Sequence, residues 1–268
     1  MKDVRIAVMK AWGKIDMKPY LYGIPSYAIM ASVGLFVMML ILYFRCQDLS
    51  FREFLLMILF MTGGVGIGSK LLFILTKIPN IIDNFSILKT INLIVESGFV
   101  FYGGLFGAMG GLWIFSKIFK KKFKRLLDLN SIGFAAFHVC GRVGCFLAGC
   151  CYGIEADWGF SMAHSPEVLR IPVQLIEGMC LIAIMLIIIV AEKFTCDLKY
   201  SFYLYIGLYA SCRFIIEFYR GDVIRGIWWC FSTSQWISIF ILFVLALLII
   251  KKTIAKSGLN KVEGFSTK

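Results

Sequence analysis

Long apolar runs constrain the fold of this chain more than any other feature. Seven such runs, each 16 to 22 residues long, follow one another between residues 27 and 250. A run of roughly 18 or more apolar residues is long enough to cross the hydrocarbon core of a membrane as a helix. Hydrophobic residues make up 60% of the chain, against about half in an ordinary soluble domain. We therefore expect an all-α, polytopic integral membrane protein with seven transmembrane helices.

The predicted spans divide the chain into three parts. Residues 1–24 are basic and are expected to form a short amphipathic helix on the membrane surface; they lack the long apolar region of a cleavable signal peptide. Residues 25–250 form the seven-span membrane domain, and a basic tail, 251–268, follows. The polar segment 152–172 is the one loop large enough for a small cap outside the membrane. The seven spans cover about residues 27–44, 54–75, 98–118, 129–147, 173–190, 202–218 and 235–250.

The basic residues predict the orientation. The loops after the first, third and fifth spans and the C-terminal tail carry 15 lysines and arginines, whereas the opposite loops carry five, or ten with the N-terminal segment. Positive loops stay in the cytoplasm, so we expect the N-terminus outside, the C-terminus cytoplasmic and the cap extracytoplasmic. The net charge of +12 then reflects basic residues that flank the spans and lie near anionic lipid headgroups. No nucleic acid partner is expected.

One motif, residues 138–153, stands out at the outer end of the fourth span. It reads His-Val-Cys-Gly-Arg-Val-Gly-Cys-Phe-Leu-Ala-Gly-Cys-Cys-Tyr-Gly. An arginine at a membrane boundary is costly, so Arg142 is a candidate functional residue. His138 lies one helical turn earlier, and two interpretations stay open for it: a core histidine with its hydrogen bonds satisfied, or a residue that transfers protons.

Further polar residues fall at the outer ends of other spans. Arg213 and Glu217 are four residues apart on one helix face, so they could form an ion pair that only fixes packing. The alternative interpretation is a site for an anionic headgroup, because Arg142 and Arg220 would remain as uncompensated charges and arginine binds phosphate through two parallel hydrogen bonds. The other polar residues at this level are Tyr102, Gln174 and Glu177.

The cysteines of the motif leave several interpretations open. Their spacing, C-x4-C-x4-C-C, is not that of a zinc ribbon, so neither a metal nor an organic cofactor is expected. A disulfide between Cys145 and Cys150 or Cys151 would suit an oxidising outer face. Packing of small side chains is an equal alternative, and a nucleophilic thiol is a third. The glycine-rich runs of the second and third spans indicate close helix packing.

Four segments together resemble the bacterial prolipoprotein diacylglyceryl transferase family. Residues 141–150 stand in the place of that family's Gly-Arg-x-Gly-Asn-Phe-x-Asn-Gly-Glu signature. Residues 101–104 are similar to its Phe-His-Gly-Gly, residues 171–177 to its His-Pro-x-Gln-Leu-Tyr-Glu, and residues 212–220 to its Phe-Arg-x-x-x-Glu-Phe-x-Arg. The resemblance covers about residues 25–250.

Five departures from the family pattern remove an asparagine, a glutamate or a histidine. Cys145 and Ala148 replace the two signature asparagines, and Cys150 replaces the signature glutamate. Tyr102 and Ile171 stand where the family has histidines. The arginines expected to face phosphate are kept, whereas the polar groups on the acceptor side are not.

The resemblance implies a membrane enzyme of the bacterial inner membrane. It would move the diacylglyceryl group of a phosphatidylglycerol-like phospholipid to the cysteine thiol of a prolipoprotein signal peptide and release glycerol phosphate. The implied catalytic residues are Arg142, Arg213, Tyr102, Glu217 and His138. The implied substrate-binding residues are Arg142, Arg220, Gln174, Glu177, Gly103, Gly104 and Cys145. Two alternatives stay open: a paralogue with the same donor and another acceptor, and a lipid-binding or lipid-moving protein without catalysis.

Overall fold

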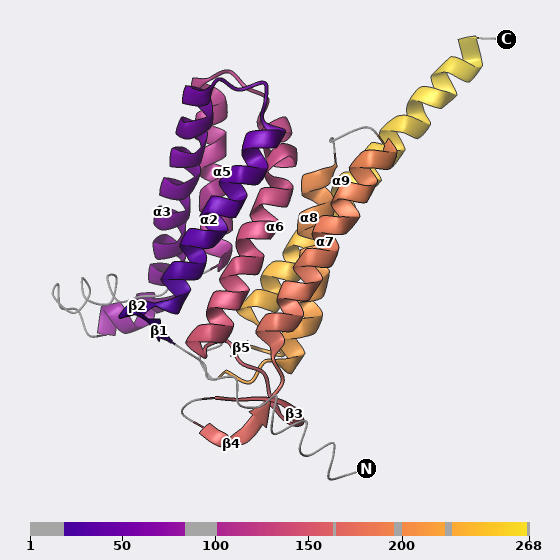
Figure 1. Ribbon diagram of the computed structural model, residues 1–268. Coiled ribbons are helices and arrows are strands. Elements are labelled where there is room, and N and C mark those ends of the chain that lie inside the picture. Colours follow the sequence, from indigo (N-terminus) through magenta and orange to yellow (C-terminus); the bar gives the residue numbers. More distant parts are fainter. Residues whose placement is uncertain (1–18, 84–100, 163–164, 196–199, 223–226, 267–268) are drawn as a thin grey trace. The chain divides into compact units, whose positions relative to one another are not determined.

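A computed structural model describes residues 19–83, 101–162, 165–195, 200–222 and 227–266 (Figure 1). The described chain is mostly helical. Its helices are α2 (Ser26–Arg45), α3 (Phe51–Asp83), α5 (Phe101–Ile118), α6 (Phe123–Ala148), α7 (Val173–Thr195), α8 (Ser201–Ile216) and α9 (Thr233–Ser266).

The described part of each predicted span lies in one of these helices, with residues 98–100 outside the described chain and residues 217–218 in the 3-10 turn that follows α8. Five are long and apolar enough to cross a membrane: α2, residues 51–75 of α3, α6, residues 173–194 of α7 and residues 233–254 of α9. The other two, α5 and α8, have 18 and 16 residues. The chain is therefore a polytopic membrane protein. Helix α9 continues to Ser266, so the tail predicted from residue 251 onward is helical over its described length.

Short strands occur where the sequence predicted only helices and loops. Strands β1 (Tyr20–Leu21) and β2 (Ile24–Pro25) pair as a hairpin. The turn residues Tyr22 and Gly23 have φ angles of 51° and 78°, the left-handed pair that a tight hairpin turn needs. The prediction of a surface helix is therefore wrong for residues 20–24, and residues 1–18 lie outside the described part of the chain.

The predicted cap between α6 and α7 contains an antiparallel pair of strands. These are β3 (Glu155–Met162) and β4 (Ser165–Arg170). A third pair, β5 (Ile227–Trp228) and β6 (Phe231–Ser232), precedes α9. The fold class is thus helical with three two-stranded sheets in the described residues, and the two later pairs lie at the helix ends that carry the candidate site.

The chain divides into two compact units, one of residues Met39–Asn130 and one of Met1–Met38 with Ser131–Lys268. In the first, α3 and α5 pack side by side through glycines (Figure 1). A Cβ atom built on Gly64 would lie 2.1 Å from the carbonyl oxygen of Gly107, and one on Gly103 would lie 2.5 Å from that of Gly68. Such separations leave no room for a side chain, so the glycines permit close helix packing, as the sequence predicted.

Helix ends in the other unit are fixed by local capping. Helix α7 starts directly after Pro172, whose carbonyl accepts hydrogen bonds from Leu175 and Ile176. Ser232 and Gln235 form a reciprocal pair at the start of α9: the Ser232 N–H donates to the Gln235 side chain, and the Gln235 N–H donates to the Ser232 hydroxyl. This capping box satisfies two donors that a helix start would otherwise leave open. The starts of α7 and α9 are held in this way.

Candidate functional site

A buried carboxylate, Glu177 on α7, joins three helices. Its Oε1 atom lies 2.8 Å from Nη2 of Arg142 on α6 and accepts a 2.8 Å hydrogen bond from the hydroxyl of Tyr209 on α8. Its Oε2 atom accepts a 2.9 Å hydrogen bond from Nη1 of Arg213, also on α8. Only 2% of Glu177 is exposed. A carboxylate at this depth needs such partners, because burial of an unpaired charge is strongly unfavourable.

The charges continue along α8 toward the cap. Arg213 Nη2 lies 2.8 Å from Glu217 Oε2, which in turn lies 3.7 Å from Nη1 of Arg220. Arg220 binds Asp222 through two parallel hydrogen bonds of 2.9 and 2.6 Å. The described residues therefore form a chain of alternating charges that runs from α6 to the end of α8.

This network corrects one part of the sequence interpretation. Arg142 and Arg220 were expected to stay uncompensated, but Glu177 neutralises the first and Asp222 neutralises the second. Glu177 was expected to bind substrate, and in the structure it holds two arginines. Arginine has five N–H donors, and the contacts of Arg142 with Glu177 and His138 engage two of them.

His138 lies against the same carboxylate. Its Nε2 atom accepts a 3.2 Å hydrogen bond from Nε of Arg142 and lies 3.8 Å from Glu177 Oε1. Because an arginine nitrogen can only donate, Nε2 serves as the acceptor, and the neutral ring then carries its hydrogen on Nδ1. The ring packs edge-on against Tyr209 with centroids 4.8 Å apart. The structure thus places His138 as a partner of Arg142.

Three cysteine thiols meet where α6 ends. The Sγ atoms of Cys145, Cys150 and Cys151 all lie within 4.8 Å of one another, and the three are free thiols. Gln174 at the start of α7 donates a 2.6 Å hydrogen bond to the carbonyl of Cys150. Gln174 thereby fixes the turn that contains Cys150 and Cys151.

Charges and thiols near the cap shift the pKa values of Cys151 and Arg220. Hydrogen bonds from the thiols of Cys145 and Cys150 lower the pKa of Cys151, and the positive charges of Arg220 and Arg142 lower it further. Burial alone would lower the pKa of Arg220, but the hydrogen bonds to Asp222 together with the negative charges of Cys151, Asp222 and Glu217 outweigh burial and raise it. The cap side of the site therefore favours a thiolate beside a permanently charged guanidinium.

The candidates from α5 lie in the other compact unit. Tyr102 is buried and stacks on Phe106 with ring centroids 6.3 Å apart. Gly103 and Gly104 face α3, where a Cβ on Gly104 would lie 3.0 Å from the hydroxyl of Ser69. Helix packing accounts for both glycines, so we leave them out of the proposed substrate site.

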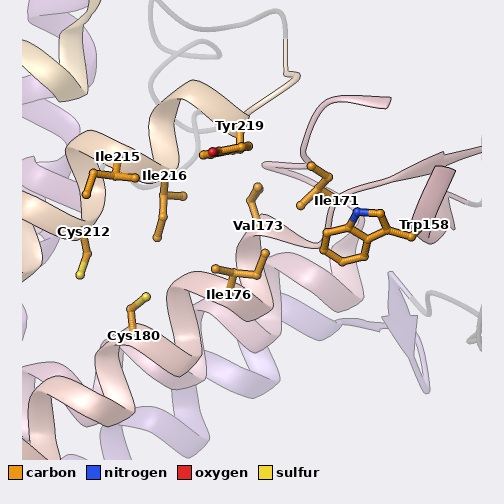
Figure 2. A pocket seen from close by; sticks show the side chains of 9 residues that line it. All are labelled: Trp158, Ile171, Val173, Ile176, Cys180, Cys212, Ile215, Ile216 and Tyr219. Atoms are coloured by element: carbon orange, nitrogen blue, oxygen red, sulfur yellow. The ribbon is translucent and has the colours of Figure 1, made fainter. Parts of the chain in front are cut away.

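An apolar cavity of about 330 Å³ opens between α7, α8 and the cap. Figure 2 shows its side chains pointing toward one another, with Trp158 of the cap at one end and Cys180 and Cys212 facing each other at the other. Its described lining is Trp158, Ile171, Val173, Ile176, Cys180, Cys212, Ile215, Ile216 and Tyr219.

Comparison with known sequences bears on what this arrangement is. A sequence model of the family described as prolipoprotein diacylglyceryl transferase matches residues 19–251. The chain belongs to that family. The match includes all four segments of the resemblance, the arginine–carboxylate network and the cysteine cluster.

Named relatives cover most of the chain. A phosphatidylglycerol–prolipoprotein diacylglyceryl transferase of Clostridium tetani is 32% identical over 85% of this chain and 95% of its own length. The second such transferase of Clostridium perfringens is 30% identical over 81% and 86%. One from Dehalococcoides mccartyi is 29% identical over 77% and 84%. Family membership makes the chain a transferase by class.

Two residues of the network, Tyr209 and Asp222, were not predicted as site residues from the sequence of this transferase-family chain. Tyr209 precedes Arg213 and Glu217 at four-residue intervals, so the first two share one face of α8 and Glu217, its C-cap, continues that face. That spacing was a usable signal. Asp222 gave a weaker one, because its pairing with Arg220 depends on the turn after α8 and not on a helical repeat.

Proposed function

We propose that this chain transfers the diacylglyceryl group of phosphatidylglycerol to the cysteine thiol of a prolipoprotein signal peptide and releases glycerol phosphate. The observation that carries the proposal is the pair of arginines from α6 and α8 held by the two oxygens of Glu177, at 2.8 and 2.9 Å. Two guanidinium groups fixed beside each other suit a phosphodiester, which accepts several hydrogen bonds at once.

Glu177 acts in this proposal by positioning, because its oxygens fix the planes of both guanidinium groups. His138 and Glu177 engage two donors of Arg142, and Glu177, Glu217 and Ser234 engage donors of Arg213. The donors that remain on the two guanidinium groups would bind the phosphate. In the reaction the bond between the glyceryl carbon and the phosphate oxygen breaks, a carbon–sulfur bond forms, and the thiol loses its proton. Negative charge grows on the leaving phosphate, and pre-positioned guanidinium donors stabilise that charge more than they stabilise the substrate.

The apolar cavity suits the hydrocarbon part of a substrate. It is lined by residues of α7 and α8, the helices that carry Glu177 and Arg213 (Figure 2). A volume of about 330 Å³ accommodates part of an acyl chain or an apolar side chain of a signal peptide. We assign it to substrate binding.

The proposed topology places this chemistry at the outer leaflet of the bacterial inner membrane. The seven helices would cross with the N-terminus outside and the C-terminus in the cytoplasm. Lipid would enter sideways from the outer leaflet, and glycerol phosphate would leave to the outside. The domain division proposed with it is an N-terminal surface segment, the seven-span core and a basic cytoplasmic tail, with the tail continuing α9.

A second candidate is the same donor chemistry with a different acceptor. The observation that favours it is the exchange of three signature residues, at positions 145, 148 and 150, for cysteine and alanine. The arginine network on the donor side does not include these positions. A change of acceptor would therefore leave the donor site intact.

Complementation distinguishes the two candidates. A strain depleted of its own transferase would express this chain, with the Clostridium tetani relative as the positive control, and the mass of a tagged lipoprotein would be measured. The proposed function predicts a lipoprotein that carries diacylglyceryl. An unmodified precursor, with consumption of phosphatidylglycerol in the same membranes, would favour the other acceptor.

A further inference from the structure

The thiols of Cys145, Cys150 and Cys151 are drawn together by the way α6 ends. The Gly149 N–H donates to the carbonyl of Phe146, and the Cys150 N–H donates to that of Cys145. Gly149 is left-handed, with φ of 71°, and these bonds define a Schellman turn. The turn folds the chain back, so Cys150 and Cys151 return to Cys145.

A strained residue completes this turn. Cys151 has φ of 59°, a conformation that a residue with a side chain adopts only when its surroundings impose it. The hydrogen bond of 2.6 Å from Gln174 to the Cys150 carbonyl fixes the turn on its other side. The three thiols are therefore held in place by backbone geometry and by a side chain from α7.

The spacing of the three sulfur atoms fits a soft metal ion. In a tetrahedral zinc site with bonds of about 2.3 Å, neighbouring sulfurs lie about 3.8 Å apart. The three Sγ atoms, all within 4.8 Å of one another, reach that arrangement by rotations of their side chains. Cys150 is exposed and the other two are half-buried, so one side of the cluster is open. A site with three protein ligands and one open position is the form that catalytic zinc takes.

We propose that Cys145, Cys150 and Cys151 bind a thiophilic divalent cation of the zinc type and leave one coordination position for the acceptor thiol. The second half of this inference rests on the proposed function. A thiol bound to such a cation loses its proton to solvent and becomes a thiolate. The sulfur then forms the bond to the glyceryl carbon, the carbon–oxygen bond breaks toward glycerol phosphate, and the uncharged thioether leaves the metal.

The other residues of the site support a role of the cation in activating the acceptor thiol. An acceptor thiol of ordinary pKa, about 8.5, needs activation near neutral pH. The Nε2 atom of His138 already accepts a hydrogen bond from Arg142, and Glu177 already holds two arginines. Three thiolates and one divalent cation leave one negative charge, and the positive charge of Arg142 acts on all three cysteines while that of Arg220 acts on Cys151.

The metal content of the protein tests whether the three cysteines bind a cation, without any assay of transfer. The purified full-length chain should contain about one zinc per chain by elemental analysis, and the cobalt-loaded protein should show near-ultraviolet thiolate-to-cobalt absorption. Cys150→Ser, at an exposed position, should lower zinc affinity by more than about tenfold, because even partners outside the ligand shell change it 10- to 100-fold. Cys140→Ser, on the same helix but outside the cluster, should bind as the unaltered chain does. Metal content equal in all three proteins, or a disulfide within the cluster of freshly purified protein, would overturn the proposal.

Transfer assays test the second half separately. Chelation of the metal and Cys150→Ser should each lower thiol transfer by at least about tenfold, and zinc should restore the chelated enzyme alone. Transfer at the full rate by metal-free protein would overturn the role in thiol activation and leave the proposed function standing. A chain that binds zinc through these cysteines but transfers nothing would keep the metal site and refute the proposed function.

Discussion

Glu177→Gln is the substitution that most directly probes the buried network. Glutamine has nearly the same shape, so the packing of α6, α7 and α8 is retained, but the charge that holds Arg142 and Arg213 is lost. The carboxylate accepts two charge-assisted hydrogen bonds from these arginines, at 2.8 and 2.9 Å. Each such bond contributes about 1.5–3 kcal/mol.

The expected loss of stability follows from burial. Glu177 is 2% exposed, and Arg142 and Arg213 are 7% and 4% exposed, so solvent cannot replace the missing charge. Removal of one partner from a buried ion pair costs about 3–5 kcal/mol, which agrees with the loss of two charge-assisted bonds. For a protein of this size that corresponds to a Tm lower by roughly 6–20 °C.

The assay is thermal unfolding of the detergent-solubilised protein, with size-exclusion chromatography to measure the folded fraction that remains after heating. Glu155→Gln is the matched control, because Glu155 also forms a 2.9 Å ion pair with an arginine, Arg170, but its own side chain is 66% exposed. An exposed pair contributes at most about 1 kcal/mol, so the control should melt close to the unaltered protein. If Glu177→Gln melts as the control does, the carboxylate is not a buried link between charged helices.

Three further substitutions or labels probe other parts of the structure. Arg142→Lys keeps a charge beside Glu177 but loses the planar donors, so the protein should stay folded while its transfer rate falls about 30- to 1,000-fold; an unchanged rate would contradict phosphate binding by Arg142. Gly107→Ala should destabilise the protein by about 1–3 kcal/mol, because the new Cβ would lie 2.0 Å from a backbone oxygen, whereas Gly110→Ala meets nothing within 4 Å and should have little effect. A membrane-impermeant maleimide should label exposed Cys230 on intact protoplasts if the proposed topology is right. Burial raises the pKa of Cys46 to about 11, so that thiol stays protonated and unlabelled at pH 8 even in opened membranes. If Cys230 is labelled only after the membranes are opened, the orientation is the opposite of the proposed one.

Hydropathy predicted the helices because each span is a local property of the sequence. The hairpin at residues 20–25 was missed, since its turn depends on two left-handed residues and not on composition. The role of Glu177 was also missed: its partners lie 35 residues before it and 36 after it, and only packing of three helices brings them together. The sequence left open a disulfide between Cys145 and Cys150 or Cys151, but it did not predict that all three thiols meet, because that depends on the Schellman turn that reverses the chain between them.

Transfer by the purified chain is the direct test of the proposed diacylglyceryl transfer. The full-length protein, in vesicles that contain phosphatidylglycerol, would be given a prolipoprotein signal peptide with one cysteine, and the peptide mass and released glycerol phosphate would be measured. We expect a peptide heavier by one diacylglyceryl group, equimolar glycerol phosphate, and loss of both products with Arg142→Lys. An unmodified peptide under conditions in which the Clostridium tetani relative modifies it would contradict the account.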